Sequence, residues 1–229
     1  MNTAGWIWFW GVLFVISHLG ISSKRVRPRL IRAVGAQAYR GIYSLVAFAT
    51  LVPLIFAFSY HKHSGPMLWY LRDNDTMRAL AMLLMLFAFM FFAGSLVNPA
   101  PSGMGGAVIG EPHRILKITR HPLFVAFILF GFAHLLMNGW LGDIGFFGTF
   151  SALGLVGGWH QDSRKLGELG AAYAELERTS SFFPGGAIIS GRQKFAADDV
   201  PWLALGLGVA LTAIILWLHP TLFGGHPLR

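Results

Sequence analysis

The sequence predicts an all-α fold: a polytopic membrane helix bundle of about six transmembrane helices, forming one integral membrane domain over residues 1–229. Only 12% of the residues are charged, against about 25% in a typical soluble domain, and 55% are hydrophobic. Several apolar runs approach the ~20 residues that cross about 30 Å of hydrocarbon. The chain has no cysteine, which excludes disulfides, thiolate catalysis and thiolate ligation of haem or iron–sulfur clusters.

The first helix is expected from Gly5 to about Ser22. The residues before it contain no Lys or Arg, and no small-residue cleavage site follows it. It is therefore interpreted as a retained span rather than a signal peptide, and its tryptophan cluster is typical of a membrane interface. The other helices are expected at about residues 41–60, 77–97, 122–140, from the break at 141–143 to 160, and 200–219.

Three polar connections separate these helices. Residues 24–40 are strongly basic. Residues 98–121 are rich in the Pro and Gly that form turns, and the sequence leaves open whether they re-enter the membrane. Residues 162–178 are expected to form an amphipathic helix on the membrane surface.

The distribution of Lys and Arg predicts the topology. Most of them fall on the three connections just described, which an even number of spans puts on one side. The positive-inside rule then places these connections in the cytoplasm and both termini outside. The net charge of +8 is explained by contact with the anionic headgroups of the lipid bilayer, so no nucleic-acid partner is expected.

Two histidines lie inside apolar helices. Pro122 begins one of them, in the first helical position that suits proline, and His134 follows twelve residues later. His18 lies in the first helix. An imidazole at hydrocarbon depth is a functional-site hypothesis by default. The alternative interpretation is an interhelical hydrogen bond, worth about 0.6–2 kcal/mol.

Haem suits these histidines better than zinc does, because the core offers no cysteine and few carboxylates. A haem needs one or two imidazoles, a wide apolar cavity and cations near its carboxylates. Arg114 and Arg120 are candidates for the cations. Gly131, one turn before His134, is expected to let a flat macrocycle approach the helix.

Helix geometry counts against a simple pair of His18 and His134. At 1.5 Å per residue, His18 lies ~20 Å from the outer end of its helix and His134 only ~9 Å from the outer end of its own. His121 or His160 would match His18 in depth better. The remaining histidines at outer ends or loops, His61, His63, His219 and His226, are interpreted as solvated surface.

Six short motifs resemble one known family, the NnrU family. They are S-H-L-G-I-S at 17–22, A-Y-R-G-I-Y-S-L at 38–45, T-R-H-P-L at 119–123, A-H-L-L-M-N-G at 133–139, Q-D-S-R-K at 161–165 and T-S-S-F-F-P at 179–184. Together they span roughly residues 5–185. The helix at about 200–219 lies outside this resembling region and is expected as an additional C-terminal span.

The resemblance implies an integral protein of the bacterial inner membrane, multi-pass with both termini periplasmic, associated with denitrification through nitrite and nitric oxide reduction. The family is similar to plant zeta-carotene isomerase, a haem b enzyme that isomerises a cis double bond in a long polyene. The ligands carried over from that relative are His18 and His134. The relative has a cysteine where this chain has Gly131, so any ligand switch here would need another residue.

Three functions stay open on this basis. The first is a haem b-binding protein of nitrite or nitric oxide metabolism, with a nitrogen-oxide ligand and contact with denitrification reductases. The second is a haem-dependent cis–trans isomerase of a carotenoid-like apolar polyene. The third is a non-catalytic membrane scaffold, so whether the chain is an enzyme is left open. The expected cofactor-binding residues are His18, His134, Arg120 and His121, with His18 and His134 as the metal ligands.

Overall fold

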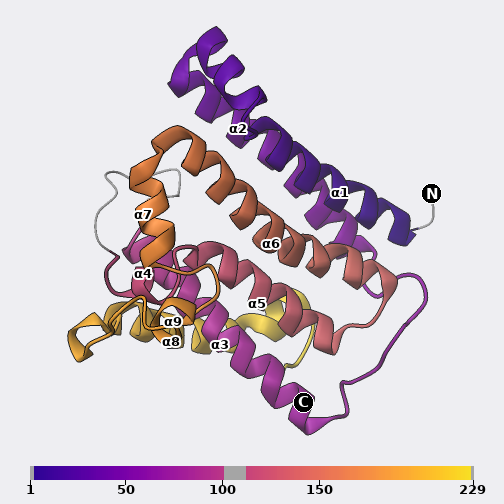
Figure 1. The fold of residues 1–229 in the computed structure, drawn as a ribbon. Helices are drawn as coiled ribbons and strands as arrows, with labels where there is room; N and C mark the ends of the chain where they lie inside the picture. Colours follow the sequence, from indigo (N-terminus) through magenta and orange to yellow (C-terminus); the bar gives the residue numbers. More distant parts are fainter. Residues whose placement is uncertain (1–2, 101–111, 228–229) are drawn as a thin grey trace.

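A computed structural model describes residues 3–100 and 112–227 and forms a helical bundle (Figure 1). Its helices are α1 (Thr3–Ile21), α2 (Val26–Tyr60), α3 (Asp75–Val97), α4 (Ile115–Ile118), α5 (Pro122–Met137), α6 (Leu141–Leu169), α7 (Ala171–Thr179), α8 (Gly186–Ile189) and α9 (Trp202–Phe223), with a 3-10 turn η1 at Ala197–Asp199. Within the described ranges, the only β pairing is one isolated bridge between Met67 and Trp140. The predicted all-α fold is confirmed.

In the part of the chain that the structure describes, five helices are long and apolar enough to cross a bilayer: α1, α2, α3, α6 and α9. The sixth apolar helix, α5, has 16 residues, about 24 Å at the helical rise. Large apolar side chains face outward from the bundle, including Leu45 and Trp217, which are 69% and 79% exposed. Lipid is the surrounding that such a surface requires, so the protein is a membrane protein.

Two helix boundaries differ from those expected. α2 begins at Val26 rather than near residue 41, because the basic stretch is itself helical and is separated from the span by Gly35, whose φ of 82° and ψ of 160° are not helical. α6 continues to Leu169 rather than ending near residue 160. The expected surface helix at 162–178 is therefore divided at Gly170, whose φ is +55°, between the end of α6 and α7. Polar residues alone did not end α6, because Arg164 and Glu168 form a helical ion pair one turn apart.

Glycines bring the helices into close contact. α1 packs against α2 and α6, α5 packs against α3 and α6, and α9 packs against α3. A Cβ on Gly131 would meet Ser151 and would lie 2.6 Å from the carbonyl oxygen of Phe147. Small residues at such contacts let transmembrane helices approach one another. Gly131 therefore serves the packing of α5 on α6, and not the approach of a macrocycle as the sequence suggested.

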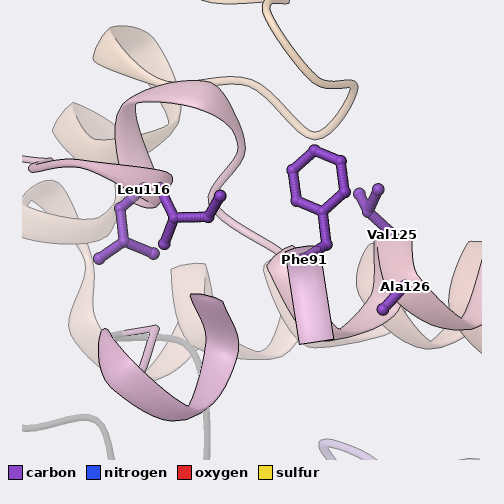
Figure 2. Packing of buried hydrophobic residues seen from close by; sticks show 5 residues of the cluster. Phe91, Leu116, Val125 and Ala126 are labelled. Atoms are coloured by element: carbon purple, nitrogen blue, oxygen red, sulfur yellow. The ribbon is translucent and has the colours of Figure 1, made fainter. Parts of the chain in front are cut away.

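A buried apolar cluster joins the short helix α4 to the seam between α3 and α5. Figure 2 shows its members Phe91, Leu116, Val125 and Ala126, which come from these three helices. Directly after α4, Thr119 Oγ1 donates to the carbonyl of Phe182 at 2.6 Å. The segment that leads into α5 is thereby fixed on both sides.

The two ends of the bundle differ in which connections they hold. The N-terminus and the α2–α3 connection lie at one end, called the outer end, and α4 and α7 lie at the opposite, inner end (Figure 1). The inner end holds the described parts of the three basic connections. Residues 101–111, part of the segment considered for membrane re-entry, lie outside the described residues.

Candidate functional site

Among the residues that the structure describes, two pockets of small-molecule size lie between the helices. One contains His18 and has a volume of about 550 Å³; the other contains His134 and has a volume of about 510 Å³. Both are partly open at the surface of the bundle. We call them the His18 pocket and the His134 pocket. Both volumes fall in the ~300–1,000 Å³ range of ligand sites.

The His18 pocket is an apolar chamber formed by α1, α2, α3, α5 and α6. Its aromatic walls are Phe14, Phe48, Phe124, Phe127 and Phe150. Among the residues that the structure describes, no Asp, Glu, Lys or Arg lines it; its polar groups are His18, Tyr43, Ser44, Ser95, His121 and Gln161. Such a chamber suits a long uncharged ligand that needs few polar contacts.

The His18 ring lies between two aromatic rings, 5.2 Å from Phe14 and 4.7 Å from Tyr43 between centroids. Its Nδ1 atom is buried and has no hydrogen-bond partner. A buried polar atom without a partner costs about 1–3 kcal/mol. The alternative interpretation of the sequence, an interhelical hydrogen bond, is therefore not met at His18 Nδ1.

A buried charge network lies at the inner end of the chamber. We call it the Asp162 cluster, and its members are Arg120, His121, Asp162 and Tyr173. The Asp162 carboxylate accepts from Arg120 Nη2, His121 Nε2 and the Tyr173 hydroxyl, each at 2.6 Å. Burial, together with the nearby Asp162 carboxylate, raises the pKa of Tyr173, so its hydroxyl stays protonated and donates. The cluster ties the start of α5 to α6 and α7.

The Asp162 cluster holds two residues that the sequence predicted to bind a cofactor, Arg120 and His121. The Arg120 side chain is only 12% exposed and pairs with Asp162. Its Nη2 also lies 3.7 Å from Glu177 Oε1. His121 is buried and is held through Nε2, and it also lines the His18 pocket. The structure thus brings His18 and His121 to one chamber and places Arg120 in an ion pair behind it.

The His134 ring is held rigidly at the outer part of α5. Its Nδ1–H donates to the carbonyl of Phe130 at 2.8 Å, and the ring stacks on Phe147 with centroids 4.5 Å apart and an interplanar angle of 16°. A carbonyl can only accept, so the proton of the neutral imidazole lies on Nδ1 and Nε2 keeps its lone pair. Metal-bound histidines characteristically have this arrangement.

The His134 pocket lies between α5 and α9, with α3 as its floor, since α3 packs against both. Each helix contributes one face: Ala81, Met82, Met85 and Phe89 from α3; Ala133, His134 and Met137 from α5; Thr212, Ile215, Leu216 and His219 from α9. Arg72 and Arg78 line it at the outer end. An apolar floor with a cationic rim suits a flat apolar ligand that carries anionic groups.

His18 and His134 are not brought together. α1 runs parallel to α6, with Ile7 beside Gly142 and Gly11 beside Thr149, and the space next to His18 is lined by Gly157. His134 instead stacks on Phe147. Ten residues of α6 separate these two levels, about 15 Å, so this arrangement keeps the difference in depth found from the sequence. The metal-binding role assigned to each histidine stays a prediction.

A row of aromatic rings joins the two pockets. Phe127 and Phe150 line the His18 pocket and lie 6.0 Å apart between centroids. Phe150 lies 5.3 Å from Phe130, which in turn lies 4.4 Å from the ring of His134. The pockets are separate chambers with a continuous π-rich connection.

Sequence reasoning missed the outer members of the site. His219 was interpreted as solvated surface, and Arg72 and Arg78 were not among the expected site residues, yet all three line the His134 pocket. The sequence shows that His134 and His219 each lie near the outer end of an apolar helix, but it does not show that both line one pocket. Among the described residues, no group of three or more His, Cys, Asp or Glu could hold a bare metal ion, whereas a haem needs only one or two imidazoles.

Comparison with known proteins adds a family and two relatives. A family model described as NnrU protein matches residues 7–227, a range that continues past residue 185 and includes α9. The chain is 27% identical over 226 residues to a protein of Zea mays named 15-cis-zeta-carotene isomerase, chloroplastic, covering 91% of this chain and 58% of the relative. It is 27% identical over 231 residues to the protein of the same name from Arabidopsis thaliana, covering 93% and 59%. The chain thus spans about three fifths of the length of these relatives. No solved structure matches it.

Proposed function

The chain belongs to the NnrU family, and from this membership we propose that it is a membrane-embedded cis–trans isomerase of a long apolar polyene. The observation that carries the proposal is the His18 pocket, an uncharged aromatic chamber of about 550 Å³ inside the bundle. The names of the two relatives support the reaction type, since both act on a cis isomer of zeta-carotene according to those names.

The chamber fits the chemistry of such a substrate. A polyene offers no group for hydrogen bonds or ion pairs, so its binding depends on apolar burial and on contact between flat π surfaces. Phe124, Phe127 and Phe150 provide aromatic walls on two helices, α5 and α6. A chain longer than the chamber would bind there by its reacting segment and leave its ends in lipid.

Side chains of the chamber hold the reacting segment and keep it dry. Rotation about a double bond requires its bond order to fall for a moment, and a haem b would supply that change by exchanging one electron with the polyene and taking it back after the rotation. The protein's part is to fix the polyene against the aromatic walls and to close the inner end of the chamber with the Asp162 cluster. Water is thereby kept from the reacting segment.

We assign the haem to His134 rather than to the His18 chamber itself. The Nδ1–H bond of His134 to Phe130 leaves the lone pair on Nε2, so this imidazole would hold the haem iron through Nε2. The row of Phe130, Phe150 and Phe127 leads from this ring to the wall of the chamber. Cofactor and substrate are then separate, with aromatic side chains between them.

The role in denitrification, contact with nitrite or nitric oxide reductases, and location in a bacterial inner membrane with periplasmic termini stay predictions. The gathering of basic connections at the inner end supports that orientation. A non-catalytic scaffold would need neither the lone pair of His134 nor an aromatic chamber of this size. The isomerase accounts for both features.

The test is expression of the full chain in cells that accumulate 15-cis-zeta-carotene, with the isomer ratio measured by chromatography. We expect the 15-cis form to fall. Ala47→Trp, which places an indole in the His18 pocket, should abolish the change. Ala49→Trp, on the same helix at an exposed position outside this pocket, should retain it.

Two results would contradict this function. One is an unchanged isomer ratio at a level of expression where the protein is folded and in the membrane. The other is equal activity of the Ala47→Trp and Ala49→Trp variants, which would place the reaction outside the His18 pocket.

A further inference from the structure

We propose that His219 is the second axial ligand of the haem whose first ligand is His134, in the pocket between α5 and α9. This inference rests on the haem part of the proposed function. It differs from the pair His18 and His134 that the resemblance implies, and it follows from the side chains that meet in the His134 pocket.

The two rings have the same hydrogen-bond arrangement. His219 Nδ1–H donates to the carbonyl of Gly225 at 2.9 Å, as His134 Nδ1–H donates to the carbonyl of Phe130 at 2.8 Å. Each bond puts the proton on Nδ1 and leaves the lone pair on Nε2. Both imidazoles are therefore prepared for coordination through the same atom, and their orientation is fixed before any ligand binds.

The two histidines also match in depth. α5 and α9 both run from the inner to the outer end, and His134 lies three residues before the end of α5 while His219 lies four before the end of α9. Measured from these ends, their depths differ by only about 2 Å. Both line the same pocket. His18, about 15 Å away along the direction of α6, satisfies none of these conditions.

The rest of the pocket suits the other parts of a haem. Met82, Met85 and Phe89 give the apolar surface that a macrocycle needs. Arg72 and Arg78 lie at the outer rim, where the two carboxylates of the haem would reach the polar edge of the membrane. Arg72 is held in place by bonds to Met137 and Asn138 at the end of α5, and guanidinium groups bind carboxylates well.

The experiment is titration of ferric haem into the detergent-solubilised full chain, followed by absorption and electron paramagnetic resonance. We expect a low-spin, six-coordinate spectrum. His134→Ala and His219→Ala should each lose the low-spin signal. His18→Ala should keep it, as should His61→Ala, which changes a histidine at the outer end that lines neither pocket.

Exogenous imidazole separates a lost ligand from a lost fold. Added to His219→Ala, it should enter the vacated space and restore the low-spin signal, whereas a misfolded variant would not respond. The inference is overturned if His219→Ala keeps the six-coordinate spectrum, if His18→Ala loses it, or if the folded wild-type chain takes up no haem. Loss of the low-spin signal in His219→Ala alongside an unchanged polyene ratio for the wild type would reject the isomerase and keep the ligand.

Discussion

The His18 pocket and the His134 pocket each contain a histidine from an apolar helix, but the two rings differ in their hydrogen bonds and in their neighbours. In the first, the ring lies between two aromatic rings and its buried Nδ1 has no partner. In the second, the ring is bonded, stacked and accompanied by a second histidine and two arginines. Burial of an imidazole in a membrane helix therefore does not identify a ligand. The bond made by its other nitrogen and the charges around it are the features that support our proposal for His134.

Asp162→Ala should have the largest effect: it should lower the stability of the protein and, in the fraction that stays folded, impair the His18 pocket but not the His134 pocket. Without the carboxylate, Arg120, His121 and Tyr173 lose their shared acceptor. Breaking a buried ion pair by removing one partner costs ~3–5 kcal/mol. Unfolding in detergent should show a loss of this size, and the isomer ratio should no longer change.

The control for Asp162→Ala is Glu175→Ala, which removes an exposed ion pair with Arg178 on α7. It should leave stability unchanged, because exposed pairs contribute little. If Asp162→Ala weakens haem binding in the folded fraction as strongly as it weakens isomerisation, the two pockets do not act separately.

Arg78→Ala should weaken haem binding about tenfold, the equivalent of one charge-assisted hydrogen bond of ~1.5 kcal/mol. The measurement is the dissociation constant of haem from an absorption titration. Haem dimethyl ester, which lacks the carboxylate charges, is the matched probe and should bind the wild type and Arg78→Ala equally. A tenfold difference with the ester as well would mean that Arg78 supports the fold of the pocket and not the carboxylate.

Gly208→Leu should move α9 away from α3 and so displace His219. A Cβ on Gly208 would lie 2.6 Å from Met90, and overpacking of this kind costs about 1–3 kcal/mol. Gly206→Leu, with nothing within 4 Å of its Cβ, gains the same helix propensity without the clash. The low-spin signal should fall in Gly208→Leu alone, and an equal fall in both variants would argue against the role of α9.

Phe147→Leu should have the smallest effect. It removes the ring stacked on His134, a contact worth about 0.5–1.5 kcal/mol, but the Nδ1 bond to Phe130 still orients the imidazole. We expect haem affinity to fall by roughly two- to tenfold with the low-spin signal retained. Phe146→Leu, whose ring stacks on Phe58, is the control, and a larger loss there than in Phe147→Leu would contradict the assignment.

The fold was largely predictable from the sequence because membrane spans are defined by length and apolarity. What composition could not provide was where a helix continues through polar residues. α6 runs past His160 because Arg164 and Glu168 support another turn, and it ends only at Gly170. Likewise Gly35, and not the basic character of the stretch before it, separates that stretch from the span of α2.

The site was predicted in part. The sequence alone predicted that His134 lies inside an apolar helix. The helical rise alone predicted that His134 and His18 differ in depth. The assignments of Arg120 and Gly131 depended on what lies opposite them in space, namely Asp162 and Ser151, and a single sequence contains no such information. His219 was missed because a histidine near a helix end is indistinguishable from a solvated one until a second helix is packed beside it.

The break at Gly35 has a consequence for how the protein sits in its bilayer. The nine residues that precede it, Val26–Val34, contain Arg27, Arg29 and Arg32, and the bend lets this arm lie along the headgroups while the rest of α2 descends into the acyl chains. The basic arm thus anchors the inner end of α2 at the level of the headgroups. In a thicker or thinner membrane, a change of angle at this bend would let the span of α2 tilt to match the hydrocarbon thickness while the basic arm stays at the headgroups.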